Sequence, residues 1–323
     1  MTFADLIVRS TERLGPESAP QARWIVAHAA GVSGSQLPTL FDREVNAEVR
    51  SFVDELLDRV DRGEPLQYAI GSWQFRDLEL AVDPRVLIPR PETESIVDFA
   101  LEELEHFEEQ FQHLQRGRDD LRQQDDPIVV ADLGTGSGAI ALSISLEGTR
   151  SSLPTSTHYR RSRRRIEVWA TDNSQDALDV ASQNLRALER VDPGAAGCVR
   201  LAKGSWFDAL PTHLQGRVAL IVSNPPYVSE SEWELLDPVV RDHEPVEALV
   251  AGPTGVEDLA RLIEVAPRWM LPGGSLVLEL APAQAVALAE LARSSGRYAD
   301  VRARKDLAGR VRAVVARTPP QVR

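Results

Sequence analysis

The stretch IVVADLGTGSGAIALSIS, residues 128–145, constrains the fold of this chain more than any other. An apolar run at its start predicts a buried strand, and an apolar run at its end predicts a helix. Between them stand Gly134, Gly136 and Gly138. Glycine is needed where the backbone takes a positive φ or passes close to a ligand, and a helix start offers free N–H groups. The stretch therefore predicts a strand, a turn and a helix, with a nucleotide-like ligand at the turn.

Strand-like and helix-like segments alternate from Ile128 onward. Such alternation is typical of a parallel sheet with helices on both faces, and apolar runs such as VALIV fit strands that are buried on both sides. We therefore expect an α/β fold. The expected strands cover residues 128–133, 167–171, 199–202, 218–223, 275–280 and 310–316, and the expected helices cover residues 138–147, 174–189, 256–270 and 282–294.

The chain before this region has a different pattern. PQARWIVAHAAG and NAEVRSFVDELLDRVDRG carry apolar residues at three- and four-residue intervals and end on Gly, which predicts helices. From Gln67 to Val86 polar and apolar residues alternate, as in a strand pair. We expect a helical domain over 1–65, a hairpin linker over 66–90 and an α/β domain over 91–323.

Composition limits the classes of function. The chain has 323 residues, of which 43% are hydrophobic and 26% charged, and its net charge of -13 gives no overall attraction to nucleic acid. Cys198 is the only cysteine, which excludes an intrachain disulfide and a multi-cysteine metal site and fits a reducing compartment. We find no metal-binding cluster, no signal peptide and no apolar run near the membrane-spanning length. We therefore expect a cytoplasmic protein without membrane contact.

Two segments interrupt the alternation of strands and helices. Residues 106–127 are charged and rich in Gln, and residues 148–165 contain Ser, Thr and Pro followed by an arginine cluster. Both are expected to be solvated insertions in loops or a helix extension. Contact with an anionic partner is the alternative for the cluster. Its members are Arg160, Arg161, Arg163, Arg164 and Arg165.

The ligand of the glycine turn has two interpretations. Gly134-x-Gly136-x-x-Ala139 also satisfies the fingerprint of dinucleotide-binding folds. The second expected strand ends at Asp172, whose carboxylate can accept hydrogen bonds from both ribose hydroxyls of an adenosyl group, or can cap the helix that begins near Ser174. In dinucleotide folds the acidic residue follows the glycines by about 20 residues. Asp172 lies further on, and the arginine-rich insertion could account for this, so spacing leaves the cofactor open.

The core strand expected at 218–223 ends in Asn224-Pro225-Pro226-Tyr227. Proline fixes its own φ at about -65° and keeps the preceding residue extended, so the strand ends in a stiff ledge. The Asn224 side-chain carbonyl and the Pro225 backbone carbonyl can then accept both N–H bonds of one NH2 group, beside the flat wall of Tyr227. Positioning of this kind can lower a barrier by about 7 to 11 kcal/mol. The matching electrophile is the methyl group of S-adenosylmethionine, and a rigid turn is the alternative.

The chain resembles the HemK-type N5-glutamine methyltransferases, which modify class I peptide-chain release factors. The resemblance covers residues 20–317 apart from the two insertions. It rests on LQYAIGSWQF, VLIPRPETE, DLGTGSGAIAL, ATDNS, GSWFDAL, NPPY and DLAGRVRAVVAR. NPPY is shared with N6-adenine DNA methyltransferases, whereas IPRPETE is highly specific. The chain departs from the family at Ser205, where members often carry Asp, and in LELAP, which lacks the Gly usually found after the strand's Glu.

The resemblance implies a class I methyltransferase fold, with a seven-stranded, mostly parallel, doubly wound sheet, a small N-terminal helical domain for substrate recognition and a linking hairpin. It implies methyl transfer from S-adenosyl-L-methionine to the glutamine of the Gly-Gly-Gln motif, with Asn224 and Pro225 orienting the amide. The implied substrate contacts are Asn224, Pro225, Pro226 and Tyr227. The implied cofactor contacts are Gly134, Thr135, Gly136, Ser137, Gly138, Asp172, Trp206 and Asn224, with a place in the core as the alternative for Trp206.

Other functions remain open at this point. An N6-adenine nucleic-acid methyltransferase would use the same ledge, although the negative charge argues against a nucleic-acid substrate. A nicotinamide-dependent oxidoreductase would use the glycine fingerprint and would leave the ledge unexplained. A non-catalytic binding module would be favoured if no cofactor binds.

Overall fold

The computed structural model describes residues 1–115, 126–150 and 165–320. Part of each expected insertion lies outside these ranges, as do Arg160, Arg161, Arg163 and Arg164 of the arginine cluster. Residues 106–115 belong to a long helix, α5 (Glu94–Gln115), so this part of the first insertion is a helix extension. No helix within the described ranges is both long and apolar enough to cross a membrane.

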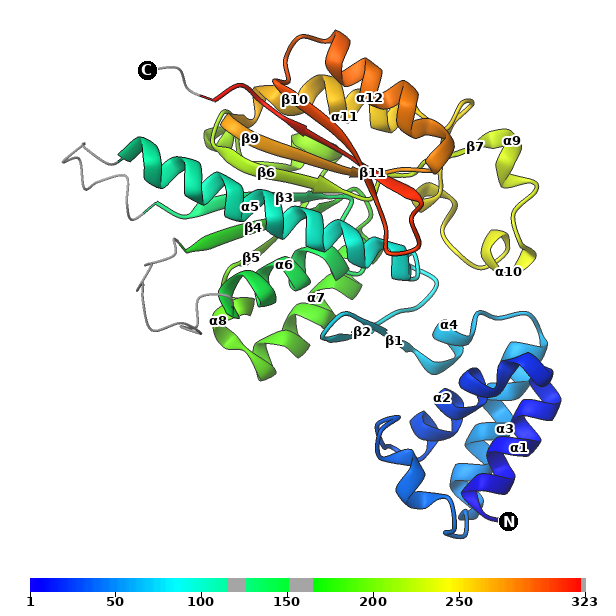
Figure 1. Cartoon of the computed structure of the whole chain (residues 1–323). Helices are drawn as coiled ribbons and strands as arrows, with labels where there is room; N and C mark the ends of the chain where they lie inside the picture. The colour runs from blue at the N-terminus through cyan, green and yellow to red at the C-terminus, as the bar shows by residue number, and fades with distance from the viewer. Residues whose placement is uncertain (116–125, 151–164, 321–323) are drawn as a thin grey trace.

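A seven-stranded sheet forms the centre of the larger part of the molecule (Figure 1), with the order β10-β11-β9-β6-β3-β4-β5. The strands from β9 to β5 pair in parallel, and β11 runs antiparallel to both β9 and β10. The expected seven-stranded, mostly parallel, doubly wound sheet is therefore confirmed. The strands are β3 (Ile128–Leu133), β4 (Ile166–Asp172), β5 (Val199–Lys203), β6 (Val218–Ser223), β9 (Met270–Glu279), β10 (Asp300–Lys305) and β11 (Val311–Arg317).

Helices cover both faces of this sheet (Figure 1). One face packs against α5, α6 and α7, and the other packs against α11 and α12. Short elements connect these layers. The helices are α6 (Ala139–Arg150), α7 (Gln175–Val191), α8 (Pro193–Ala196), α9 (Glu230–Trp233), α10 (Pro238–Arg241), α11 (Glu257–Val265) and α12 (Ala285–Ser294), and the strands β7 (Val228–Ser229) and β8 (Val250–Gly252) form a small separate pair.

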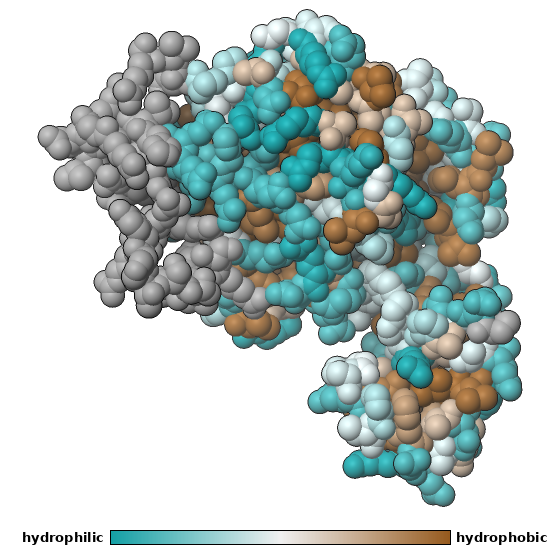
Figure 2. Space-filling model, in the orientation of Figure 1, coloured by the Kyte–Doolittle hydropathy of each residue, from teal (hydrophilic) through white to brown (hydrophobic). Residues whose placement is uncertain are grey.

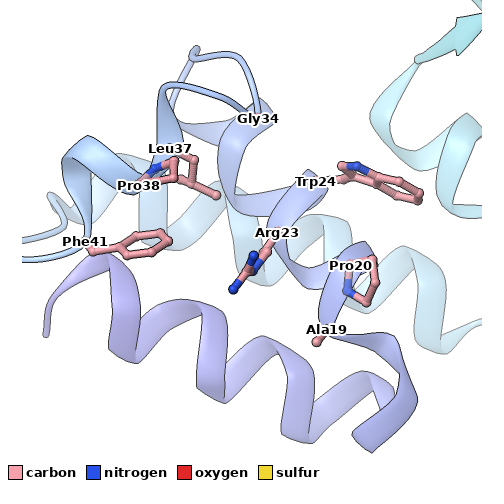
Figure 3. A pocket seen from close by; sticks show the side chains of 8 residues that line it. All are labelled: Ala19, Pro20, Arg23, Trp24, Gly34, Leu37, Pro38 and Phe41. Carbon is pink, nitrogen blue, oxygen red and sulfur yellow. The ribbon is translucent and has the colours of Figure 1, made fainter.

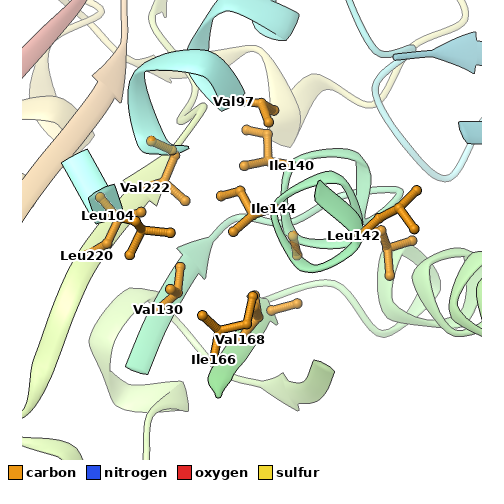
Figure 4. Close-up of a cluster of buried hydrophobic side chains, with 14 of the residues drawn as sticks. Val97, Leu104, Val130, Ile140, Leu142, Ile144, Ile166, Val168, Leu220 and Val222 are labelled. Atoms are coloured by element: carbon orange, nitrogen blue, oxygen red, sulfur yellow. The ribbon is translucent and has the colours of Figure 1, made fainter. Parts of the chain in front are cut away.

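The core explains why the central strands read as continuous apolar runs. All six residues of β6 are buried. Because side chains alternate along a strand, Leu220 and Val222 join the cluster on the α5–α6 face, where Ile144 of α6 packs (Figure 4), while Ile221 joins the cluster on the α11–α12 face. A strand buried on both faces favours apolar residues at nearly every position, and the one polar residue of β6, Ser223, is hydrogen-bonded.

Two expectations about these elements were wrong. The helix expected over 256–270 ends at Val265, because Pro267 cannot continue it and the chain enters β9 at Met270. Strand β10 was not expected at all. It lies at the sheet edge with the sequence DVRARK, and its Arg302 pairs with Glu103 of α5 at 2.7 Å. Charged residues at a solvated edge hide the apolar signal of a strand.

The N-terminal residues form a separate helical lobe, which projects from the larger body (Figure 2). Helices α1 (Phe3–Leu14), α2 (Ala19–Ala29), α3 (Ala47–Asp61) and α4 (Leu66–Ile70) build this N-terminal lobe around a core that includes Leu6, Ile25 and Leu56. The two helices expected from sequence are α2 and α3. Gly31 and Gly63 follow them at φ 64° and 93°, the left-handed conformation that ends many helices. The domain limits at residues 65 and 90 remain a prediction.

A short hairpin joins the N-terminal lobe to the sheet. Its strands β1 (Ser72–Phe75) and β2 (Leu78–Ala81) are shorter than the expected range from Gln67, because residues 66–70 form α4. Arg76, in the hairpin turn at φ 50°, donates two hydrogen bonds to the Glu147 carboxylate of α6, at 2.5 and 2.7 Å. A third bond reaches the Glu94 carbonyl at 3.0 Å. The turn is thereby fixed to two helices of the sheet domain.

Replacing Arg76 by Ala should lower the free energy of unfolding by roughly 2 to 4 kcal/mol, because it leaves the half-buried Glu147 carboxylate without its bidentate partner. Urea denaturation measures the loss. Arg85→Ala is the matched control in the same linker, where an exposed pair with Asp83 contributes about 0 to 1 kcal/mol. Equal losses in the two variants would contradict an anchoring role for Arg76.

Candidate functional site

The residues expected at the site lie together at one edge of the sheet. Asp172 is the last residue of β4, the glycine turn follows β3, and Asn224 follows β6. The chain runs from β3 through β4 to β5 and then crosses to β6 on the other side of β3. Ligands of open α/β sheets bind outside the carboxyl ends of the strands at such a reversal of strand order. The topology therefore selects this edge independently of any motif.

The glycine turn takes the conformation that its sequence predicts. Gly134, Gly136 and Gly138 all have positive φ, at 75°, 56° and 86°. Substitution at any of them would strain the backbone. A Cβ at Gly138 would also lie 3.1 Å from Leu142, whereas a Cβ at Gly136 would meet no atom within 4 Å. Gly136 thus faces open space, where a ligand can approach the backbone.

A buried carboxyl group, that of Asp132, holds this turn by hydrogen bonds. Asp132 is fully buried, and its Oδ2 accepts hydrogen bonds from the Thr135 hydroxyl at 2.6 Å and the Ala141 N–H at 3.1 Å. Its Oδ1 has no partner within the described ranges. Burial raises the pKa of Asp132 to about 7, and the nearby charge of Asp172 acts in the same direction.

Asp172 connects the end of β4 to the glycine turn. Its Oδ2 accepts from the Gly136 N–H at 2.9 Å, and its Oδ1 accepts from the Ser174 N–H at 2.9 Å. The capping alternative for Asp172 is wrong, because Ser174 is the N-cap of α7 and its hydroxyl accepts from the Ala177 N–H. Burial raises the pKa of Asp172. Each carboxylate oxygen keeps a second lone pair for a ligand hydroxyl.

Trp206 completes this side of the site. A Cβ on Gly134 would lie 3.5 Å from the Trp206 ring, so the ring lies beside the turn. Trp206 is partly buried, and its indole N–H donates to Asp258 of α11 at 3.1 Å. Its φ of 51° is strained for a residue with a side chain, and such strain is found mainly at functional sites. Asp258 was not expected at the site, because no local sequence pattern connects it to Trp206.

These three features fit a nucleoside-bearing cofactor. Gly136 leaves room for close approach, Asp172 offers carboxylate oxygens to ribose hydroxyls, and Trp206 offers an aromatic surface beside the turn. Thr135 and Ser137 are buried, and the Thr135 N–H donates to the Thr171 carbonyl at 2.8 Å, so of these two residues the Ser137 N–H remains for a ligand. Across the described residues no group of three or more His, Cys, Asp or Glu is arranged to hold a metal ion.

The Asn-Pro-Pro-Tyr ledge begins beside the glycine turn. The Ser223 hydroxyl donates to the Leu133 carbonyl at 2.5 Å and ties the end of β6 to the end of β3. Pro225 is buried, and the Tyr227 carbonyl accepts from the Gln284 side-chain amide at 2.9 Å. Gly255 lies directly under the ledge, since a Cβ there would come within 2.8 Å of the Tyr227 carbonyl.

Asn224 has a defined orientation. Its Nδ2 donates to the Thr93 hydroxyl at 3.4 Å, a long hydrogen bond, and within the described ranges no residue donates to its Oδ1. The amide oxygen is therefore available to an incoming N–H group. Thr93 lies in the 3-10 turn Pro91–Thr93, within the IPRPETE motif, but the sequence analysis assigned no role to it. The motif itself was the only available signal.

A hollow lies in the N-terminal lobe, away from the glycine turn and the ledge. It has a volume of about 300 Å³ (Figure 3). Most of its lining is apolar, and Arg23 supplies a positive charge. The lining residues are Ala19, Pro20, Arg23, Trp24, Gly34, Leu37, Pro38 and Phe41.

Stability should fall as the pH rises from 5 to 8, because the folded protein keeps a proton on Asp132 that the unfolded chain, with an ordinary carboxyl pKa, has already released. The stabilisation is complete below the unfolded pKa and is lost as the pH passes the folded value of about 7. Asp132→Asn should reduce this fall by roughly 1 to 3 kcal/mol. Urea denaturation at both pH values, with the exposed Asp208→Asn as control, measures it, and an unchanged pH dependence in Asp132→Asn would contradict a protonated Asp132.

Comparison with known proteins agrees with this geometry. A family model described as the PrmC N-terminal domain matches residues 6–71. A release factor glutamine methyltransferase of Rhodopirellula baltica is 36% identical over 291 residues, covering 90% of this chain and 86% of the relative. Another, of Burkholderia pseudomallei, is 36% identical over 308 residues, covering 95% and 94%.

Among solved structures, the hMettl16 catalytic domain in complex with MAT2A 3'UTR hairpin 6 has a TM-score of 0.50 at 14% identity and covers 86% of this chain and 87% of that chain, a likeness of fold alone. The two bacterial relatives are similar over nearly the whole sequence. The chain belongs to the release factor glutamine methyltransferase family.

Proposed function

We propose that this enzyme transfers a methyl group from S-adenosyl-L-methionine to the side-chain amide nitrogen, N5, of the glutamine in the Gly-Gly-Gln motif of class I peptide-chain release factors. Family membership supports the substrate class. The observation that carries the chemistry is the orientation of Asn224, whose Oδ1 is left for an N–H group at the carboxyl edge of the sheet. The proposal implies a cytoplasmic location, because release factors act on ribosomes.

The cofactor would be held by the glycine turn, Asp172 and Trp206. The Ser137 N–H, the one N–H of Gly134 to Gly138 that has no acceptor within the described ranges, and the carboxylate of Asp172 would bind its polar groups, beside the indole ring of Trp206. When bound, S-adenosyl-L-methionine supplies a methyl group attached to a sulfonium, which is a strong electrophile. The protein would then have no electrophile to generate. It would have to position the nitrogen, which forms its bond to the methyl carbon as the carbon–sulfur bond breaks and then loses one of its two protons to water.

The Asn-Pro-Pro-Tyr ledge would perform that positioning. An amide nitrogen is a weak nucleophile because its lone pair is delocalised into the carbonyl. Asn224 Oδ1 and the Pro225 carbonyl would accept the two N–H bonds of the glutamine amide, so that its lone pair points in one direction. Tyr227 would provide a flat wall for the planar amide. Holding the nucleophile in an attack-ready geometry is the main contribution to catalysis in this scheme.

The alternatives from the sequence have less support. An adenine substrate would fit the same ledge, but the chain has a net charge of -13 and its bacterial relatives carry the name of a glutamine methyltransferase. A nicotinamide-dependent oxidoreductase would leave the orientation of Asn224 without a use. What favours these alternatives is the glycine fingerprint for the oxidoreductase and the shared NPPY motif for the adenine methyltransferase.

The N-terminal lobe would recognise the release factor. Its hollow presents Trp24 and Phe41 with Arg23 between apolar walls, which fits an apolar side chain next to an acidic group. The Trp24 ring also meets Trp73 of the hairpin edge-on, with 4.8 Å between ring centroids. A substrate protein held by the lobe would therefore be held at a fixed place relative to the hairpin.

Replacing Asn224 by Ala should lower the rate constant of methyl transfer to a purified release factor by roughly 10²- to 10³-fold, because one preorganised polar contact to the nucleophile is lost. Transfer of a labelled methyl group measures the rate, and calorimetry with S-adenosyl-L-methionine checks that cofactor binding changes much less. Unchanged turnover would exclude the role given to Asn224. Label that enters duplex DNA instead of the release factor would overturn the proposed substrate.

Replacing Arg23 by Glu should raise the KM for the intact release factor by roughly 10-fold, because a charge reversal removes attraction and adds repulsion at a docking surface. The kcat should stay nearly constant, since Arg23 lies far from the ledge. Arg50→Glu, an exposed reversal on α3 outside the hollow, is the matched control. Equal changes of KM in the two variants would exclude the hollow as the docking site.

A further inference from the structure

The carboxyl group of Glu279 lies beside Asn224. Strands β6 and β9 are parallel neighbours, and their last paired residues are Ser223 and Leu278. Asn224 and Glu279 are the next residues on the two strands. Parallel strands in register present such a pair on the same face, so the two side chains are adjacent at the site.

Glu279 is an unusual group to find there. It is fully buried, and neither of its carboxyl oxygens has a hydrogen-bond partner of ordinary geometry within the described ranges. A buried polar group without partners is destabilising and calls for a role. Burial raises the pKa of Glu279 to about 7. The largest influence that lowers this pKa is the Thr93 hydroxyl, followed by the guanidinium groups of Arg312 and Arg90.

Thr93 therefore stands between the two groups. Its side chain is buried, its hydroxyl acts to lower the pKa of the Glu279 carboxyl, whose oxygens have no hydrogen bond of ordinary geometry within the described ranges, and its oxygen accepts from Asn224 Nδ2 at 3.4 Å. A hydroxyl has one hydrogen to donate and lone pairs to accept with, while an ionised carboxylate only accepts. If the Thr93 hydrogen is used on Glu279, only its lone pairs remain for Asn224, and they can accept only from the NH2 end of the amide.

We propose that Thr93 and Glu279 are positioning residues for methyl transfer: Glu279 draws the Thr93 hydroxyl hydrogen, and Thr93 in turn holds the Asn224 amide with its oxygen toward the substrate NH2 group. This inference rests on the proposed function of Asn224. The Asn224–Thr93 bond is long and the Glu279 carboxyl has no bond of ordinary geometry without substrate, and such contacts commonly shorten in the reactive complex.

The opposite orientation of the Asn224 amide shows why Thr93 and Glu279 matter. With Oδ1 toward Thr93, the hydroxyl hydrogen would turn to Asn224 and away from the Glu279 carboxylate. The NH2 group of Asn224 would then meet the NH2 group of the substrate glutamine, and two donors cannot bond. The carboxylate of Glu279 excludes this arrangement without touching the substrate.

Paired variants of Thr93 provide the first test, at pH 8, where Glu279 is ionised. Thr93→Val keeps the shape of the side chain and removes the hydroxyl, and it should lower kcat for release-factor methylation by roughly 10- to 100-fold, the effect of a misdirected buried hydrogen bond. Thr93→Ser restores the hydroxyl and should recover most of the activity. Cofactor affinity by calorimetry should be the same in both. Equal kcat values for the two variants would overturn the proposal.

Paired variants of Glu279 provide the second test. Glu279→Leu removes the acceptor and should lower kcat as Thr93→Val does, whereas Glu279→Gln keeps an oxygen that can accept from Thr93 and should stay within about threefold of the wild type. Thermal unfolding of each variant separates a loss of fold from a loss of positioning. A Glu279→Gln variant that is folded and as inactive as Glu279→Leu would mean that the charge, and not the acceptor, is what counts.

A double-mutant cycle separates this inference from the proposed function. Because Thr93 acts through Asn224, adding Thr93→Val to Asn224→Ala should change kcat by less than about twofold, although it is damaging in the wild type. A full additional loss would overturn the positioning role and leave the function of Asn224 intact. Full activity in Asn224→Ala itself would instead remove the proposed function.

Discussion

The alignment of three parallel strands, β4, β3 and β6, is the constraint on which the site depends. Two sets of bonds outside the regular ladder fix their carboxyl ends. The Thr171 carbonyl accepts from the N–H groups of Gly134 and Thr135 at 2.9 and 2.8 Å, and the Ser223 hydroxyl donates to the Leu133 carbonyl. A shift of register by one residue would move every side chain of β3 and β6 to the opposite face of the sheet, out of the layer in which it packs, so the ends cannot slide. The glycine turn and the ledge are therefore held side by side before any ligand binds.

The parts of the fold that were predicted correctly are those in which one local pattern decides the outcome. Strands β3 and β6 are continuous apolar runs, and their limits agree with those expected. The wrong predictions concern segments whose sequence pattern is set by the elements that pack against them. The arginines of strand β10 pair with glutamates of α5. The helix expected to continue to residue 270 was extended over Ala266 and Met270, which are buried in the core although α11 has ended. Tertiary contacts set both patterns, and a single sequence does not display them.

The residues of the site likewise fall into those that sequence could predict and those that it could not. The glycine turn, Asp172 and Asn224 could be found because each follows a recognisable strand. Thr93 and Asp258 could not, because their contacts with Asn224 and Trp206 join residues 131 and 52 positions apart. Glu279 could be placed at a strand end, but only the pairing of β6 with β9 shows that it lies beside Asn224. Sequence thus identifies the groups that are expected to contact the ligands, and the structure adds the groups that lie against them.

The ledge is supported from a distant part of the chain. The Gln284 side-chain amide donates to the carbonyls of Tyr227 and Gly255, both at 2.9 Å, and its oxygen accepts from the Ala281 N–H. Gly255 has a φ of 77° and has no space for a Cβ. Position 255 consequently does not tolerate any residue that has a side chain. The ledge itself therefore has little freedom to diverge, because the residue directly beneath it accepts no side chain.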